Sequence, residues 1–380
     1  MPNIHKRKDG YYYVRIPIGK DENGKYQYDI IFDKKKTVLE NKLKNYEKNK
    51  GINGERLDKT PFTLSEWTYR HLFNSVHANV SASTFNGYMS LYETHIKGSE
   101  LGEMKIKDIK PMDLQNFLNN LKSKGKHTKG EQLAASSVRK LKFLLSNTFK
   151  SAMINNVVAH NPMDYIKLPK NTKKEKSRTA LTVNEQAAYI KACDSERYGF
   201  LYILALFTGM RMGELIGLKW ECVDFDKKII TIAEAIKYTT VYDSEGNSHK
   251  EHVTKAPKSE KGKREIPIPK SLLTRFKELK LQSNSDYVFS TSNGTPLNQG
   301  NINRGHTAIC ERAGINHIPF HSLRHTYATR LLEAGENFKT LQELLGHADI
   351  STTMNIYAHV LEKTKKNTAD KLDKLFSKMV

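Results

Sequence analysis

Cysteine is scarce in this 380-residue chain, and its apolar runs are short. The three cysteines, Cys193, Cys222 and Cys310, are odd in number and far apart, so we expect free thiols of a reducing cytoplasm rather than a disulfide framework. The most apolar stretch, residues 198–210, is too short to span a bilayer and predicts a buried helix. The basic N-terminus lacks the apolar run of a secretion signal. We therefore expect a soluble, cytoplasmic protein without membrane contact.

Nucleotide-binding and metal-binding signatures are missing as well. The chain contains no P-loop and no Gly-rich nucleotide fingerprint. Cys310, His317, His321 and His325 are close in sequence and suggest zinc, but they form neither a CxxC nor an HExxH pattern. We therefore expect no cofactor and no metal.

Positive charge, by contrast, is abundant. The chain has 62 Lys and Arg against 41 Asp and Glu, a formal net charge of +21. Such an excess costs self-repulsion unless a polyanion offsets it, and nucleic acid is the commonest polyanion for a soluble protein. The alternative is a lysine-rich proteome that raises the charge of every protein. A hydrophobic content of 38% suits globular packing, and the length predicts two or three domains.

Three segments differ in their patterns, and together they predict a mainly α fold with small β elements (α+β). In residues 1–60 the runs YYYVRIPI and YQYDIIF, joined by KDENGK, predict a hairpin, and a lysine-rich helix follows over residues 34–50. This small sheet suits DNA binding and an ordinary solvated sheet equally well.

The second and third segments are mostly helical. Residues 61–170 show helical periodicity, with caps expected at Ser83 or Thr84 and at Ser136 or Ser137. A basic, proline-interrupted tether leads into residues 171–380, where residues 228–269 predict three short strands among helices. Residues 369–379 predict an amphipathic helix, which either packs on its own domain or docks elsewhere.

Four motifs of the third segment, TGMRMGEL, KAPKSEKGKREIPIP, HSLRH and LGHADISTTMNIYAH, together supply two arginines, a lysine, two histidines and a tyrosine. These residues are Arg211, Lys258, His321, Arg324, His347 and Tyr357. One such residue alone is usually a salt-bridge or packing residue. The combination provides what phosphoryl transfer without a metal needs. Guanidinium forks neutralise the phosphate, an acid protonates the leaving alkoxide, and a base assists the phenol.

These motifs resemble those of the tyrosine recombinases, specifically the integrases of phages and conjugative transposons, from the tether to near the C-terminus. The resemblance implies that Tyr357 attacks the scissile phosphate and leaves a 3′-phosphotyrosine and a free 5′-hydroxyl. It implies a phosphate clamp formed by Arg211 and Arg324. Glu214 matches an acidic position that orients the site.

The remaining roles also come from the resemblance. Lys258 is the general acid at the 5′ oxygen, His321 takes the tyrosine proton, and His347 donates a hydrogen bond to a phosphate oxygen. Several lysines crowd the turn, and Lys261 is the alternative acid. The proline before Lys258 and the serine after it resemble the Pro-Lys-Thr run of the family, which favours Lys258.

The resemblance also implies partners and an assembly. The helical domain of residues 61–170 and the catalytic domain of residues 171–380 clamp a core site on double-stranded DNA. Residues 1–60 form a three-stranded sheet that binds arm sites. A homotetramer forms on DNA through exchange of the C-terminal helix, an excisionase or DNA-bending protein assists, and the bound protein is nucleoid-associated. Two alternatives are a type IB topoisomerase and a DNA-binding regulator without catalytic activity. The arm-like domain and the tail argue against the first, and the complete residue set argues against the second.

Overall fold

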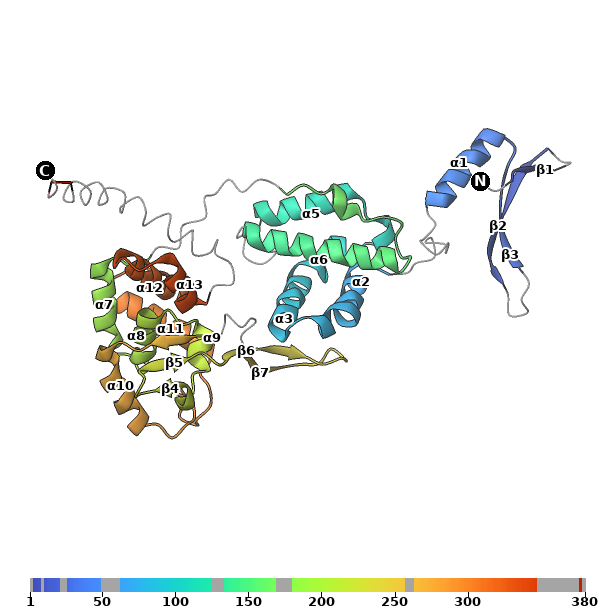
Figure 1. The fold of residues 1–380 in the computed structure, drawn as a ribbon. Coiled ribbons are helices and arrows are strands. Elements are labelled where there is room, and N and C mark those ends of the chain that lie inside the picture. Colours follow the sequence, from blue (N-terminus) through green and yellow to red (C-terminus); the bar gives the residue numbers. More distant parts are fainter. Residues whose placement is uncertain are drawn as a thin grey trace. The chain divides into compact units, whose positions relative to one another are not determined.

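The computed structural model describes residues 3–7, 10–20, 26–48, 62–124, 133–168, 180–256, 263–346 and 376–377 (Figure 1). The chain divides into two compact units, one with Met1–Lys173 and Thr240–His249, the other with Lys174–Thr239 and Lys250–Val380. The domain boundaries predicted at residues 60 and 170 stay predictions. None of the described helices combines the length and the hydrophobicity that a bilayer-spanning segment requires.

The N-terminal segment is a three-stranded antiparallel sheet with one helix. Strands β1 (His5–Lys6), β2 (Tyr12–Lys20) and β3 (Tyr26–Asp33) lie in that order and precede α1 (Lys36–Lys48). Side chains alternate along β2, so Val14 and Ile16 face inward and pack with Leu39 and Leu43 of α1. The predicted hairpin and helix are therefore confirmed.

The second segment is a helical bundle. Its elements are α2 (Leu64–His71), η2 (Leu72–Val76), η3 (His77–Asn79), α3 (Ala82–Leu91), η4 (Tyr92–Ile96), α4 (Glu100–Glu103), η5 (Ile106–Asp108), α5 (Pro111–Lys124), α6 (Ala135–Ile154) and η6 (Pro162–Tyr165). Leu114 and Leu118 of α5 and Leu141 and Leu145 of α6 are fully buried, as their helical spacing predicts.

The predicted helix caps in this segment were wrong. The cap of α3 is Ser81, whose hydroxyl pairs with that of Thr84 at 2.9 Å, and α6 starts after Ala134. A cap residue must keep an extended backbone. Ser83, Thr84, Ser136 and Ser137 already lie within the first helical turns, so none of them can be a cap.

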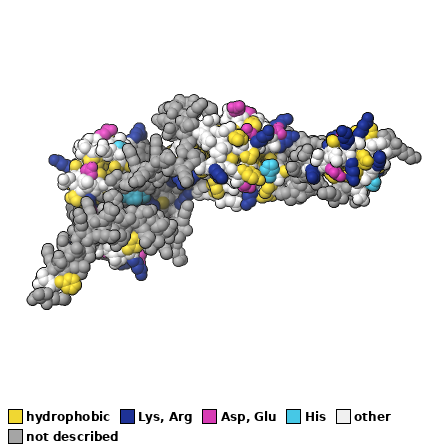
Figure 2. All heavy atoms as spheres, turned by 90° about the horizontal axis from the view of Figure 1, so that it is seen from above, with side chains coloured by type: hydrophobic (Ala, Val, Ile, Leu, Met, Phe, Trp, Pro, Cys, Tyr) yellow, Lys and Arg dark blue, Asp and Glu magenta, His cyan; other side chains and the backbone are white. Residues whose placement is uncertain are grey.

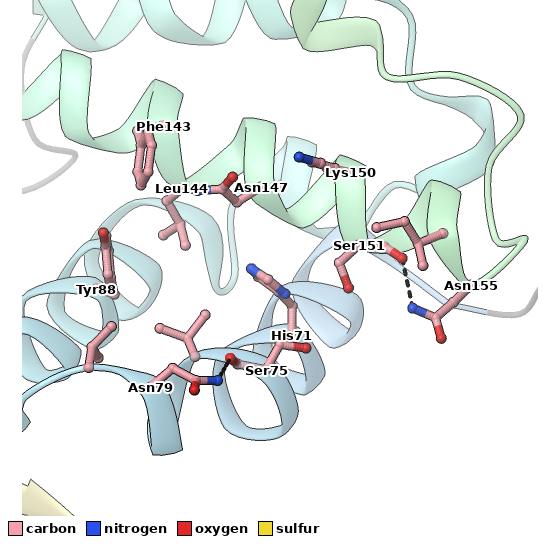
Figure 3. Close-up of a pocket in the computed structure, with 13 residues that line it drawn as sticks. His71, Ser75, Asn79, Tyr88, Phe143, Leu144, Asn147, Lys150, Ser151 and Asn155 are labelled. Carbon is pink, nitrogen blue, oxygen red and sulfur yellow. Dashed lines mark hydrogen bonds between the residues drawn. The ribbon is translucent and has the colours of Figure 1, made fainter.

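A cavity of about 460 Å³ opens among α2, η2, α3 and α6 (Figure 3). His71, only 9% exposed, points toward α6, and Asn147, Lys150 and Ser151 line the opposite wall. Neither ring nitrogen of His71 has a hydrogen-bond partner among the described residues.

The third segment is built around the buried helix α8. Its helices are α7 (Val183–Cys193), α8 (Gly199–Thr208), α9 (Met212–Ile216), η7 (Trp220–Cys222), α10 (Lys270–Leu281), α11 (Gln299–Arg312), α12 (His321–Glu333) and α13 (Phe338–Leu345). Seven of the eight residues 201–208 in α8 are buried, all but Phe207, which confirms the buried helix predicted for residues 198–210. Helix α12, which carries the HSLRH motif, packs against α8.

The strands of this segment differ from the three predicted. They are β4 (Val223–Asp224), β5 (Ile229–Thr231), β6 (Ala235–Tyr242), β7 (Ser248–Lys255) and β8 (Glu265–Pro267). One antiparallel sheet has the order β4-β5-β8, and β6 pairs with β7 in a separate hairpin. Residues 229–242, which we predicted as one strand, form two strands instead. The break lies between β5 and β6, where the carboxylate of Glu234 forms an ion pair with Lys219 at 3.1 Å.

Candidate active site

The position of Arg211 is fixed by a tight turn between two helices. Helix α8 ends at Gly209, which has a left-handed backbone with φ of +63°. A Cβ at this position would lie 2.4 Å from Cδ1 of Tyr327, so only glycine fits. The chain then turns so that Arg211 caps the short helix α9, and its backbone N–H donates to the Glu214 carboxylate at 2.8 Å. Arg211 and Glu214 therefore lie one helical turn apart.

Glu214 is buried and lies between two arginines. Arg211 Nη1 donates to Glu214 Oε1 at 2.7 Å, and Arg264 donates through Nη1 to Oε1 at 3.0 Å and through Nη2 to Oε2 at 2.8 Å. Burial alone would raise the pKa of Glu214. The hydrogen bonds and charge of Arg264, with those of Arg211, outweigh burial and lower the pKa to about 2. Glu214 is therefore ionised throughout the physiological range.

Arg324 is a buried cation. It lies on α12, is 3% exposed, and donates through Nη1 to the carbonyl of Gly209 at 2.8 Å and through Nη2 to the carbonyl of Leu345. Its Nε is buried without a hydrogen-bond partner among the described residues. Burial, and then the positive charge of Arg211, lower the pKa of Arg324 to about 9, so the side chain is still charged at neutral pH.

Three arginines converge on the C-terminal end of α13. Arg264 Nε donates to the carbonyl of Leu344 at 2.7 Å, Arg324 to that of Leu345, and Arg211 Nη2 to that of Gly346 at 2.9 Å. The last carbonyls of a helix lack partners within the helix and carry its negative dipole, so cations are favourable there. Segments from α9, β8, α12 and α13 therefore meet at one point.

This cluster has more positive than negative charge. Arg211 and Arg264 donate to the carboxylate of Glu214, whereas Arg324 donates to backbone carbonyls. Three guanidinium groups and one carboxylate leave two positive charges uncompensated among the described residues of the cluster. The side chain of Arg211 is 40% exposed, whereas those of Arg264 and Glu214 are nearly inaccessible. An anion that reaches the exposed arginine finds guanidinium groups suited to bidentate binding of phosphate oxygens.

Arg211 and Arg324 are thus brought together, with Glu214 between Arg211 and Arg264. His321 is the first residue of α12, one turn before Arg324, and its ring lies perpendicular to that of His325 at 5.0 Å. Lys258, His347 and Tyr357 lie outside the described residues, and so does Lys261.

Sequence reasoning missed Arg264. The only signal was its place in the motif KAPKSEKGKREIPIP, which we interpreted for its strand and its lysine. Tyr327 is the tyrosine described at this site, and burial raises the pKa of its phenol to about 12.

Net charge does not locate a DNA-binding surface by itself. Figure 2 shows lysine and arginine side chains in several separate groups on the described part of one face, mixed with hydrophobic and acidic side chains.

Comparisons with known proteins identify related sequences and structures. Residues 179–364 match the phage integrase family, and residues 63–122 match the N-terminal SAM-like domain of phage integrases. The chain is 36% identical to a tyrosine recombinase XerC-like protein of Caldanaerobacter subterraneus subsp. tengcongensis, over 98% of both sequences.

Two solved structures share the fold. The Tn1549 transposon integrase in complex with a circular intermediate DNA superposes with a TM-score of 0.65 at 22% identity, covering 82% of this chain and 99% of that one. A lambda integrase tetramer bound to a Holliday junction superposes with a TM-score of 0.54 at 21% identity, covering 92% of this chain and 96% of that one. The predicted α+β class is confirmed.

Proposed function

The chain belongs to the phage integrase family of tyrosine recombinases, and on that basis we propose that it cuts and rejoins DNA through a covalent bond between Tyr357 and a 3′-phosphate. The family assignment does not favour the alternatives of a type IB topoisomerase or an inactive regulator. The observation that carries the proposal is the buried guanidinium cluster. It has two uncompensated positive charges and one exposed arginine, as a phosphodiester clamp requires.

In the proposed reaction the phenolic oxygen of Tyr357 attacks phosphorus, and the bond from phosphorus to the 5′ oxygen breaks. His321 takes the phenolic proton, and Lys258 gives a proton to the leaving 5′ oxygen. Arg211 and Arg324 neutralise the charge that grows on the non-bridging oxygens. The 5′-hydroxyl of another strand reverses these steps and releases the tyrosine.

The remaining roles complete this site. His347 donates a hydrogen bond to a phosphate oxygen; it follows directly on Gly346, whose carbonyl Arg211 holds. The phosphotyrosine conserves the energy of the broken bond, so the scheme uses neither ATP nor a metal. Lys258 is favoured over Lys261 as the acid on the sequence around it.

The proposed partner is double-stranded DNA at core crossover sites, with a homotetramer as the active assembly. The Tn1549 and lambda enzymes, solved with DNA and as a tetramer on a Holliday junction, support this by likeness of fold. Exchange of the C-terminal helix and an excisionase or DNA-bending partner belong to the same proposal, as does integration and excision of a mobile element.

The proposal is tested with a DNA duplex that carries the crossover site of the element and a nick beside the scissile phosphate. Cleavage then releases a short fragment and traps the covalent adduct, which a denaturing gel resolves. We expect an adduct with the wild type and none with Tyr357→Phe. The affinity of the variant for the same DNA should be unchanged, because the phenol contributes little to phosphate binding.

Relaxation of a plasmid without the site provides the control for specificity, since a recombinase requires its own sequence. Residual strand cutting by Tyr357→Phe would overturn the assignment of the nucleophile. In parallel, Lys258→Ala and Lys261→Ala should differ, with a loss of about 10²–10⁴-fold for whichever lysine is the general acid.

A further inference from the structure

Arg264 is the most deeply buried ion-pair partner of the described site, and neither the motifs nor the comparisons give it a role. We infer that Arg264 is a positioning residue of the cleavage reaction, which holds Glu214 and the end of α13 so that Arg211 stays available to the phosphate. The inference rests on the proposed function of Arg211.

Arg264 itself does not contact DNA phosphate in this arrangement. Its side chain is 5% exposed, and all three of its guanidinium nitrogens donate to protein acceptors: Glu214 Oε1 and Oε2 at 3.0 and 2.8 Å, and the carbonyl of Leu344 at 2.7 Å. Arg211 differs, since its side chain is 40% exposed and its guanidinium donates only one hydrogen bond to Glu214, through Nη1. The two arginines on the same carboxylate therefore have different tasks.

Glu214 sets the position of Arg211. Arg264 determines how strongly Glu214 competes with DNA phosphate for the Arg211 guanidinium. Glu214 accepts from both the backbone N–H and Nη1 of Arg211. While Arg264 forms a two-bond pair with the carboxylate, most of the negative charge is neutralised by a residue that DNA cannot reach. Without Arg264, Arg211 would be the one cation among the described residues that is hydrogen-bonded to the buried carboxylate, and its guanidinium would be drawn from phosphate into that pair.

Arg264 also fixes the helix end from which His347 follows. Its bond to Leu344 is the first of three from arginines to successive carbonyls, at Leu344, Leu345 and Gly346. Because the other two arginines are the proposed clamp, a phosphate that engages them competes with the carbonyls of Leu345 and Gly346. The bond from Arg264 does not face that competition, so it can hold α13 in place during cleavage.

A stabilising role alone explains this arrangement poorly. A buried ion pair costs desolvation of both ions, and such pairs are weak sources of stability compared with apolar packing. Lysine cannot reproduce the fork to Glu214 together with the bond to Leu344, because an ammonium is a compact donor on a flexible chain. Arg264→Lys therefore keeps the charge and removes the geometry.

The test is a double-mutant cycle on the rate of adduct formation in a single turnover, with the full-length protein and the nicked duplex. We expect Arg211→Lys to lower the rate by about 10²–10³-fold, and Arg264→Lys by about 10²-fold through misplacement of Arg211. The double variant should be no slower than Arg211→Lys, because Arg264 acts through Arg211. The DNA affinity of Arg264→Lys should stay close to that of the wild type, and its melting temperature should fall, because buried hydrogen bonds are lost, but should stay above the assay temperature.

A matched control is Arg275→Lys, which alters an exposed ion pair with Asp194 and should leave the rate of adduct formation unchanged. Losses that multiply in the double variant, or a normal rate for Arg264→Lys, would disprove the positioning role. A normal rate for Arg211→Lys would instead refute the proposed clamp. If Arg264→Lys melts below the assay temperature, the cycle is repeated at a lower temperature at which the variant is folded, with the same non-additive result expected.

Discussion

At the scale of single residues, Arg324 combines burial with charge. Its guanidinium is 3% exposed, has an unpartnered Nε among the described residues, and lies close enough to Arg211 for that charge to lower its pKa. Both features are unfavourable for the protein alone. An anion beside the two arginines would accept a hydrogen bond from Nε and offset the repulsion between the two positive charges, so the site favours phosphate binding.

This preference makes Arg324→Lys an informative substitution. Lysine keeps the charge but cannot donate to the carbonyls of Gly209 and Leu345 while also presenting a fork to phosphate. We expect the single-turnover rate of adduct formation to fall by about 10²–10³-fold, with the circular dichroism spectrum unchanged. Arg312→Lys, at an exposed pair with Glu196, should cleave normally. Equal rates for both variants would argue against a clamp role for Arg324.

At the scale of elements, sequence periodicity correctly predicted the helices and strands whose buried residues recur at a regular spacing. The helices of the second segment, the N-terminal hairpin and the turn at Gly209 follow from spacing and glycine placement. The predicted cap of α3 failed because three neighbouring hydroxyl residues were equally suited to the role, and that of α6 failed because the helix starts after Ala134, which has no capping side chain. Arg264 was missed because its role depends on a tertiary contact: its partner Glu214 lies fifty residues away in the sequence.

His71, on α2 and facing α6, predicts how the stability of the protein depends on pH. Burial lowers the pKa of His71, and its ring has no partner among the described residues. The unfolded chain, with a pKa near 6.5, binds the proton more readily. Stability is therefore full above about pH 6.5 and is lost as the pH falls below it toward the folded-state pKa.

We expect His71→Leu to flatten this loss and to raise the free energy of unfolding at pH 7 by about 1 kcal/mol, since an unsatisfied buried polar group is removed. The measurement is urea unfolding at several pH values, followed by fluorescence of Trp67 in a Trp220→Phe background. Exposed His160→Leu is the control, and it should keep the dependence of the wild type. An unchanged pH dependence in His71→Leu would contradict the assignment.

At the scale of the whole molecule, the arginine cluster accounts for only a small part of the formal charge of +21, so we expect other basic residues to contact DNA. The N-terminal sheet has one face packed on α1 and one open. On the open face Arg15 is exposed and lies 5.8 Å from the ring of Tyr13, and the paired strand exposes Ile30 and Phe32 by 51% and 54%. An open face with aromatic and basic residues suits the arm-site binding that we predict for residues 1–60.

If that face lies on DNA, Arg15→Ala should remove one phosphate contact. Each neutralised phosphate releases counterions, so the slope of log affinity against log salt should become less negative by about 1. The measurement is binding of the full-length protein to a mixed-sequence 30-base-pair duplex at several salt concentrations, where the length is about three helical turns. Lys44→Ala on α1 is the matched control, because α1 covers the opposite face of the sheet through Leu39 and Leu43. A slope altered by Lys44→Ala and not by Arg15→Ala would place the DNA on the helix side, and the arm-binding prediction would then need the other face of this domain.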